Sequence, residues 1–122
     1  MAYQSFEQLE VWKRSCRLAV QLCQTVADSK LYALRDQMQR AAISMPSNIA
    51  EGSERDSRQD FVRFLRIAKG SAAELRTQCY IASKLDLLSK ADAENFTQET
   101  KEISAMLQGL IRSLSAKLKT EN

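Results

Sequence analysis

Apolar residues recur every three or four positions along most of the chain, which is the spacing of amphipathic α-helices. The first such stretch predicts a helix from about Phe6 to Ala27, followed by a turn at Asp28-Ser29-Lys30. The main apolar face of this helix carries Leu9, Trp12, Cys16, Ala19, Cys23 and Val26. A second stripe of Val11, Leu18 and Leu22 lies beside that face. The apolar arc is therefore wider than one neighbouring helix can cover.

A second helix is predicted after the turn, and Gly52 is expected to end it as a C-terminal cap. Its core face carries Leu31, Leu34, Met38, Ala42, Met45 and Ile49. Pro46 stands inside this pattern. Because proline has no backbone N–H to donate to the carbonyl four residues earlier, we expect a kink at Pro46 or a break into two shorter helices.

Two capping motifs mark the starts of a third and a fourth helix. They are Ser57 with Asp60 and Ser89 with Asp92, each pairing a side-chain acceptor with an acid in the first turn. The third helix is predicted to end near Leu87-Leu88. Its core face carries Phe61, Leu65, Ala68, Ala72, Leu75, Cys79 and Ala82, and that of the fourth carries Phe96, Ile103, Leu107, Leu110, Leu114 and Leu118. The pattern predicts an all-α, antiparallel up-and-down four-helix bundle, forming one domain over residues 1–122.

The residue types needed for common catalytic and metal sites are missing. The 122 residues include no histidine, which removes the commonest general base and the commonest metal ligand. The three glycines are isolated, so no glycine-rich phosphate loop is present. A site built only from Glu51, Glu54 and Asp56 remains a third, weaker reading, because acids at a helix end among arginines are ordinarily caps and ion pairs. We expect no enzymatic activity, no metal and no cofactor.

The three cysteines and the opening residues bear on the compartment. Cys16 and Cys23 lie about 10 Å apart along a helix, beyond the roughly 7 Å between Cα atoms that a disulfide spans. With Cys79 they fall on apolar stripes, where free cysteine acts as a small hydrophobe. The chain opens without the basic start and apolar run of a signal peptide. We expect a cytoplasmic protein.

Basic residues are unevenly distributed along the chain, whose net charge is +3. From Arg55 to Lys84 seven basic residues stand against three acidic ones, whereas from Asp86 to Glu102 five acidic residues stand against two basic ones. Arg58, Lys69 and Arg76 fall within about 20° of one another on the third helix, with Arg66 about 60–80° further round. This flank, roughly 27 Å long, suits several phosphates. A solvated face whose lysine and arginine stems cover the core edge is the alternative reading.

Two further patterns favour contacts between copies of the chain. Gly70 and Gly109 lie in the middle of helices at a cost of about 1 kcal/mol each relative to alanine, so another backbone could approach there. A polar stripe runs along the second helix through Gln37, Arg40, Ser44, Asn48 and Glu51. This stripe fits either simple solvation or a polar seam at an interface, and packing within one bundle could also explain the glycines.

Three motifs resemble a known family. They are Phe6-x-x-Leu9-x-Val11-Trp12-Lys13, then Gln37-x-x-Arg40-Ala41-Ala42-x-Ser44-x-Pro46-Ser47-Asn48-Ile49-Ala50-Glu51-Gly52, and Phe64-Leu65-x-Ile67-Ala68-Lys69-Gly70-Ser71-x-x-Glu74-Leu75. The chain resembles, over nearly its whole length, the bacterial intervening-sequence proteins of large-subunit ribosomal RNA. This resemblance implies a four-helix protomer that assembles into a ring-like homo-pentamer. Relatives of that family are pentameric accessory proteins of retroelements, thought to bind nucleic acid.

Residue patterns and resemblance together predict a homo-oligomer, taken as a pentamer, that binds RNA or DNA through backbone phosphates with little sequence specificity. The expected phosphate contacts are Arg40, Arg55, Arg58, Arg66, Lys69 and Arg76. The motif or interface residues are Asn48, Glu51, Gly52, Gly70, Ser71 and Glu74. The alternative is a protein–protein adaptor or scaffold ring that makes no contact with nucleic acid. Neither reading involves a membrane.

Overall fold

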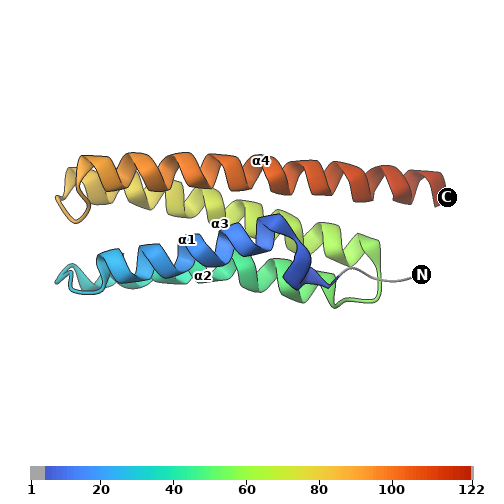
Figure 1. Cartoon of the computed structure of the whole chain (residues 1–122), viewed down its shortest axis with the longest axis horizontal. Coiled ribbons are helices and arrows are strands. Elements are labelled where there is room, and N and C mark those ends of the chain that lie inside the picture. The colour runs from blue at the N-terminus through green and yellow to red at the C-terminus, as the bar shows by residue number, and fades with distance from the viewer. Residues whose placement is uncertain (1–4, 122) are drawn as a thin grey trace.

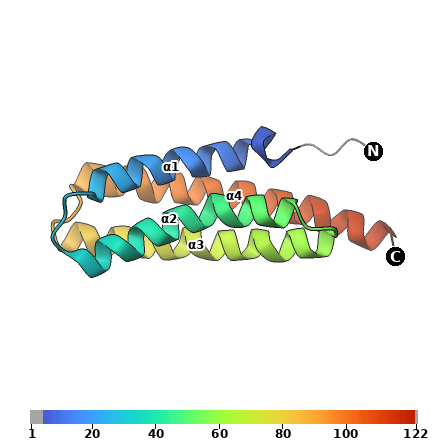
Figure 2. The ribbon, with the colours of Figure 1, turned by 90° about the horizontal axis from the view of Figure 1, so that it is seen from below.

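The computed structural model describes residues 5–121, with side chains as far as Leu118. After a single-turn 3₁₀ helix, η1 (Phe6–Gln8), these residues form α1 (Glu10–Val26), α2 (Tyr32–Ser53), α3 (Arg58–Lys84) and α4 (Lys90–Glu121). Each helix runs back along the one before it, and the chain reverses through short loops (Figure 1 and Figure 2). α3 packs against both α2 and α4, and α1 packs mainly on α2. The predicted all-α four-helix bundle is confirmed.

The ends of the helices follow the capping motifs at two of four starts. The Ser57 hydroxyl accepts the Asp60 N–H at 3.1 Å, and the Ser89 hydroxyl accepts the Asp92 N–H at 3.1 Å. At the N-terminal side, Leu9 is extended and separates η1 from α1, so the first α-helix begins at Glu10 and not at Phe6. The predicted end near Leu87-Leu88 is wrong, because α3 stops at Lys84 and Asp86 turns the chain with a positive φ of 60°.

The core of α1 takes residues from both predicted stripes. The second stripe, Val11, Leu18 and Leu22, is buried together with Ala19 and Val26 of the main face, whereas Trp12, Cys16 and Cys23 of the main face are only partly buried. The buried residues are those that face α2 and α4, the two long helices that α1 contacts. In the other helices the expected faces form the core, with Leu31 exposed and Leu34, Phe61, Leu110 and Leu118 only partly buried.

α2 continues as one helix through Pro46, which is buried. The alternative of a break into two helices is therefore wrong, and the kink stays a prediction. Gly52 does not cap the helix either, because it lies within α2 and no described glycine has a positive φ. A Cβ built on Gly52 would lie 2.6 Å from the Cβ of Phe64, so glycine is needed here for the close approach of α3.

Arg14 joins α1 to α4 through two carboxylates. Its guanidinium donates to both oxygens of Glu99, at 2.9 and 2.7 Å, and to Glu102 at 3.0 Å. Bidentate pairs of this kind fix geometry as well as contributing energy. The Arg14 side chain is 25% exposed, so the bridge is shielded from water on one side. Because α1 otherwise packs mainly on α2, this ion pair orients α1 against α4.

The same bridge makes part of the stability depend on pH. Hydrogen bonds from Arg14 and then Gln98 lower the pKa of Glu102 below its ordinary value. The ionised carboxylate is thus favoured by folding, so its contribution is complete above the unfolded-state pKa of about 4.3 and disappears as the pH falls through the lower folded value. We expect the melting temperature of wild type to exceed that of Glu102→Gln at neutral pH, with the difference closing in acid. Glu94→Gln, which removes an exposed acid from the same helix, should show no such closing difference.

Candidate nucleic-acid interface

Three of the predicted phosphate contacts lie together on the side of α3 that faces α4. By helix geometry, Arg66, Lys69 and Arg76 occupy an arc of about 80° on this side. Lys69 reaches across to α4, where its ammonium donates to the Gln108 side-chain oxygen at 2.7 Å. Arg66 is exposed and Arg76 half-buried. The structure thus brings this part of the predicted basic flank onto the seam between α3 and α4.

The Lys69–Gln108 bond also sets the register of the seam. α3 and α4 run in opposite directions (Figure 1). Residues that precede Lys69 on α3 therefore lie level with residues that follow Gln108 on α4, and residues that follow Lys69 lie level with residues that precede Gln108. Arg66 therefore lies level with Arg112, and Arg76 lies level with Lys101. Both α4 residues are exposed. We define the basic seam as five residues: Arg66, Lys69 and Arg76 of α3 with Lys101 and Arg112 of α4. Lys69 binds Gln108, and none of the five has an acidic partner within the described side chains.

The acidic residues of α4 do not neutralise the basic seam. Glu99 and Glu102 point to α1, where they bind Arg14. Lys101 lies about 160° round the helix from Glu99 and about 100° from Glu102, so it points to a different side of α4. Two of the five acidic residues between Asp86 and Glu102 are thus paired with Arg14. Glu94 lies beside the end of α3, nearer the start of α4, so the basic part of this face begins further along α4.

Arg40 and Arg55 lie apart from this group, whereas Arg58 lies on the same side of α3 as Lys69 and Arg76, about three turns nearer the start of the helix. Arg40 is exposed on α2, which packs against α3 on the side away from α4. Arg55 binds Glu51 at 3.1 Å, and its guanidinium lies 4.9 Å from the centre of the Phe64 ring. Arg58 is half-buried at the first position of α3. Arg55 is therefore engaged within the protomer, beside the turn from α2 to α3.

The motif residues of α2 and α3 meet in a polar seam. The hydroxyls of Ser44 and Ser71 lie 2.8 Å apart, and the Asn48 amide donates to the hydroxyl and carbonyl of Ser44, at 2.9 and 2.8 Å. Since Ser44 accepts from Asn48, its own proton is free to go to Ser71. Glu74 is exposed further along α3. These contacts are within one protomer, so this part of the polar stripe packs α2 on α3.

The two glycines in mid-helix have open space around them. A Cβ built on Gly70 or on Gly109 meets nothing within 4 Å. Nothing inside the bundle therefore requires glycine at either position, in contrast to Gly52. Both residues are exposed on the outer faces of α3 and α4. The close approach that the sequence suggested at these positions has no counterpart among the described residues of the protomer.

Sequence reasoning missed one end of the same face. Tyr80 and Lys84 follow Arg76 at steps of four residues, so α3 presents all three on one side. Lys90 faces them from the first turn of α4. Tyr80 is exposed, in agreement with its position outside the predicted core face of this helix. The four-residue spacing from Arg76 was the signal that could have found Tyr80 and Lys84.

The described residues offer little for chemistry. They hold no cluster of three or more acidic or cysteine side chains able to bind a metal ion. The three cysteines are free, and burial raises the pKa of the Cys79 thiol to about 12, which keeps that sulfur protonated and unreactive. In the part of the chain that the structure covers, no helix is long and apolar enough to cross a membrane.

The four packed helices make this an all-α four-helix bundle protein, and the basic seam is a feature of its surface. The sequence model of the 23S rRNA-intervening sequence proteins matches residues 7–109. The chain belongs to that family. A crystal structure of a protein of unknown function from the S23 ribosomal protein family of Bacteroides thetaiotaomicron is similar, with 25% identity and a TM-score of 0.78 over 83% of this chain and 97% of that one. No curated protein matches the chain.

Proposed function

We propose that this protein is a non-enzymatic, homo-oligomeric RNA-binding bundle that holds RNA by its backbone phosphates. The observation that carries the proposal is the basic seam, where cations of α3 and α4 stand level with one another without intervening carboxylates. Like charges placed side by side cost stability unless a polyanion neutralises them, and RNA supplies phosphates at that density. Membership of a family named for an insertion in 23S rRNA favours RNA over other polyanions.

The self-association part of the proposal, taken as a pentamer, rests on the flank of α1 and α2. Val20 on α1 is 56% exposed and Ile43 on α2 is 51% exposed. Val20 lies within about 80° of the partly buried Trp12 and Cys16 on α1, and Ile43 lies on α2, the helix on which α1 mainly packs, so apolar side chains of both helices reach the surface. A second copy packed on this flank would remove these side chains from water. Light scattering gives the subunit number, and Val20→Asp with Ile43→Asp is expected to yield monomers that remain helical.

Salt dependence of RNA binding is the direct test. With about four phosphates neutralised, a plot of log affinity against log salt on single-stranded RNA should have a slope of about −3. A fourfold rise in salt would then weaken binding about 60-fold. Filter binding on fragments of 23S rRNA measures this, with a chain of polyglutamate as a polyanion control. Absence of binding at low salt would remove the proposal.

The alternative function, a protein–protein adaptor ring, is favoured by the same exposed apolar flank of α1 and α2. An adaptor would retain a protein partner in a pull-down after nuclease treatment, whereas an RNA-bridged partner would be lost. The two functions also respond differently to mutation. Charge reversal on the basic seam would weaken RNA binding strongly and leave an adaptor contact at Val20 and Ile43 intact.

A further inference from the structure

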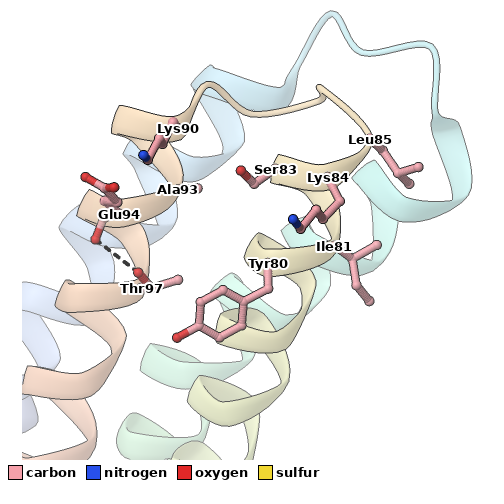
Figure 3. A pocket seen from close by; sticks show the side chains of 9 residues that line it. All are labelled: Tyr80, Ile81, Ser83, Lys84, Leu85, Lys90, Ala93, Glu94 and Thr97. Atoms are coloured by element: carbon pink, nitrogen blue, oxygen red, sulfur yellow. Dashed lines mark hydrogen bonds between the residues drawn. The ribbon is translucent and has the colours of Figure 1, made fainter.

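A cavity of about 520 Å³ opens at the end of the basic seam, between the last turns of α3 and the first turns of α4 (Figure 3). Its lining residues are Tyr80, Ile81, Ser83, Lys84, Leu85, Lys90, Ala93, Glu94 and Thr97. The volume falls within the range of roughly 300–1,000 Å³ that small-molecule pockets occupy. Most of the lining is apolar, and two lysines, one from each helix, stand at the polar part of the wall.

Tyr80 is the feature that indicates the class of ligand. Its ring projects from α3 toward α4 and is 52% exposed, although an aromatic side chain of this size ordinarily gains by burial (Figure 3). Ser83 and Lys84 extend from the same side of α3. An exposed aromatic face beside two ammonium groups is the arrangement with which single-stranded nucleic acids are bound, by base stacking and by contacts to phosphate.

The cavity continues the basic seam, so the ligand expected in it is part of the RNA strand that the seam would bind. Arg76, Tyr80 and Lys84 follow one another at four-residue steps along α3, so a strand bound to Arg76 and Lys101 would extend directly over the cavity. Lys84 and Lys90 could then hold the phosphates on either side of a base that stacks on Tyr80. A duplex cannot use this cavity, because its bases are already stacked on one another and their faces are covered.

We infer that this cavity binds one unpaired base of an RNA strand, stacked on Tyr80, with Lys84 and Lys90 contacting the flanking phosphates. The inference rests on the proposed RNA-binding function and adds a preference for single-stranded over duplex RNA. Glu94 is the acid among the lining residues. Its charge opposes the phosphates that Lys84 and Lys90 would contact, so removing it should strengthen binding of the single strand.

Fluorescence anisotropy with three labelled probes tests the inference. The probes are a short oligouridylate, a strand of the same length with every base removed, and a duplex RNA of equal length. Tyr80→Ala should weaken binding of the oligouridylate about tenfold, since base–aromatic stacking contributes about 1–3 kcal/mol, and should leave the duplex unaffected. Tyr80→Phe, which keeps the ring, should bind like wild type. Tyr32→Ala removes a tyrosine on α2 that is 58% exposed and serves as the matched control.

The abasic strand separates stacking from a structural effect of the substitution. Wild type should bind the abasic strand about tenfold more weakly than the oligouridylate, and Tyr80→Ala should bind the two strands equally. If wild type binds RNA with the expected salt dependence but Tyr80→Ala binds the oligouridylate as wild type does, the base site is refuted and the proposed function stands. If wild type binds none of the probes at low salt, both fail. Equal weakening of duplex and single strand by Tyr80→Ala would likewise overturn the base site.

Discussion

Reversing two charges of the basic seam, Arg66→Glu with Arg76→Glu, is expected to weaken RNA binding at low salt by at least about 100-fold. Each substitution removes a cation that neutralises a phosphate and places an anion where the next phosphate would lie. Because Lys69 stays in place, its bond to Gln108 continues to hold α3 in register with α4. The salt slope should also fall by about 1.4, which is two contacts at roughly 0.7 each on a single strand. Filter binding over a series of salt concentrations measures both quantities.

The matched control changes the net charge by the same amount elsewhere. Arg17 on α1 and Lys30 in the loop after it are both exposed and lie outside the seam. Reversing these two charges should weaken binding only through the lower total charge of the protein and should leave the salt slope unchanged. If the two double variants lost affinity equally, binding would depend on net charge alone, and the basic seam would not be the binding surface. Circular dichroism of both variants shows that the bundle remains folded.

Much of the fold could be predicted because it depends on local rules. The three- and four-residue spacing of apolar positions determines which residues can face a common core, and serines followed by an acid three positions later determine where α3 and α4 begin. The errors arose at positions whose surroundings depend on a helix that is distant in the sequence. Gly52 has the residue type and position of a helix cap, yet the approach of Phe64 is what requires it. The buried stripe of α1 likewise depends on where α2 and α4 lie.

The candidate site was predictable only in part, for a related reason. Periodicity within α3 placed Arg66, Lys69 and Arg76 on one flank, because a single helix determines that relation. Which side of the bundle this flank faces, and that Lys101 stands opposite Arg76, depends on the register between α3 and α4. The sequence also shows α4 as acidic near its start, whereas the structure separates those charges, with Glu99 and Glu102 paired to Arg14. Counting charges along the chain cannot make that separation.

Gly52→Ala is expected to destabilise the protein by about 2 kcal/mol, whereas Gly70→Ala should stabilise it by about 1 kcal/mol. The chemical change is the same at two helical positions, so any difference comes from the surroundings. At position 52 the added methyl would meet the Cβ of Phe64 at 2.6 Å and the backbone oxygen of Phe61 at 3.3 Å. Neither atom can move away by a change of rotamer, so α3 itself would have to shift. Overpacking of that kind costs up to about 3 kcal/mol, against which the helix preference of alanine returns about 1.

At position 70 the methyl group has open space, so only the gain in helix preference remains. Thermal unfolding should therefore show Gly52→Ala melting about 8 °C lower than wild type and Gly70→Ala about 4 °C higher, because 1 kcal/mol corresponds to about 4 °C in a domain of this size. Gly109→Ala, whose Cβ also meets nothing, should repeat the result at position 70. A gain in stability at position 52 would mean that α2 and α3 lie further apart there than described. A loss at position 70 that grows with protein concentration would instead place a second copy of the chain against that face of α3.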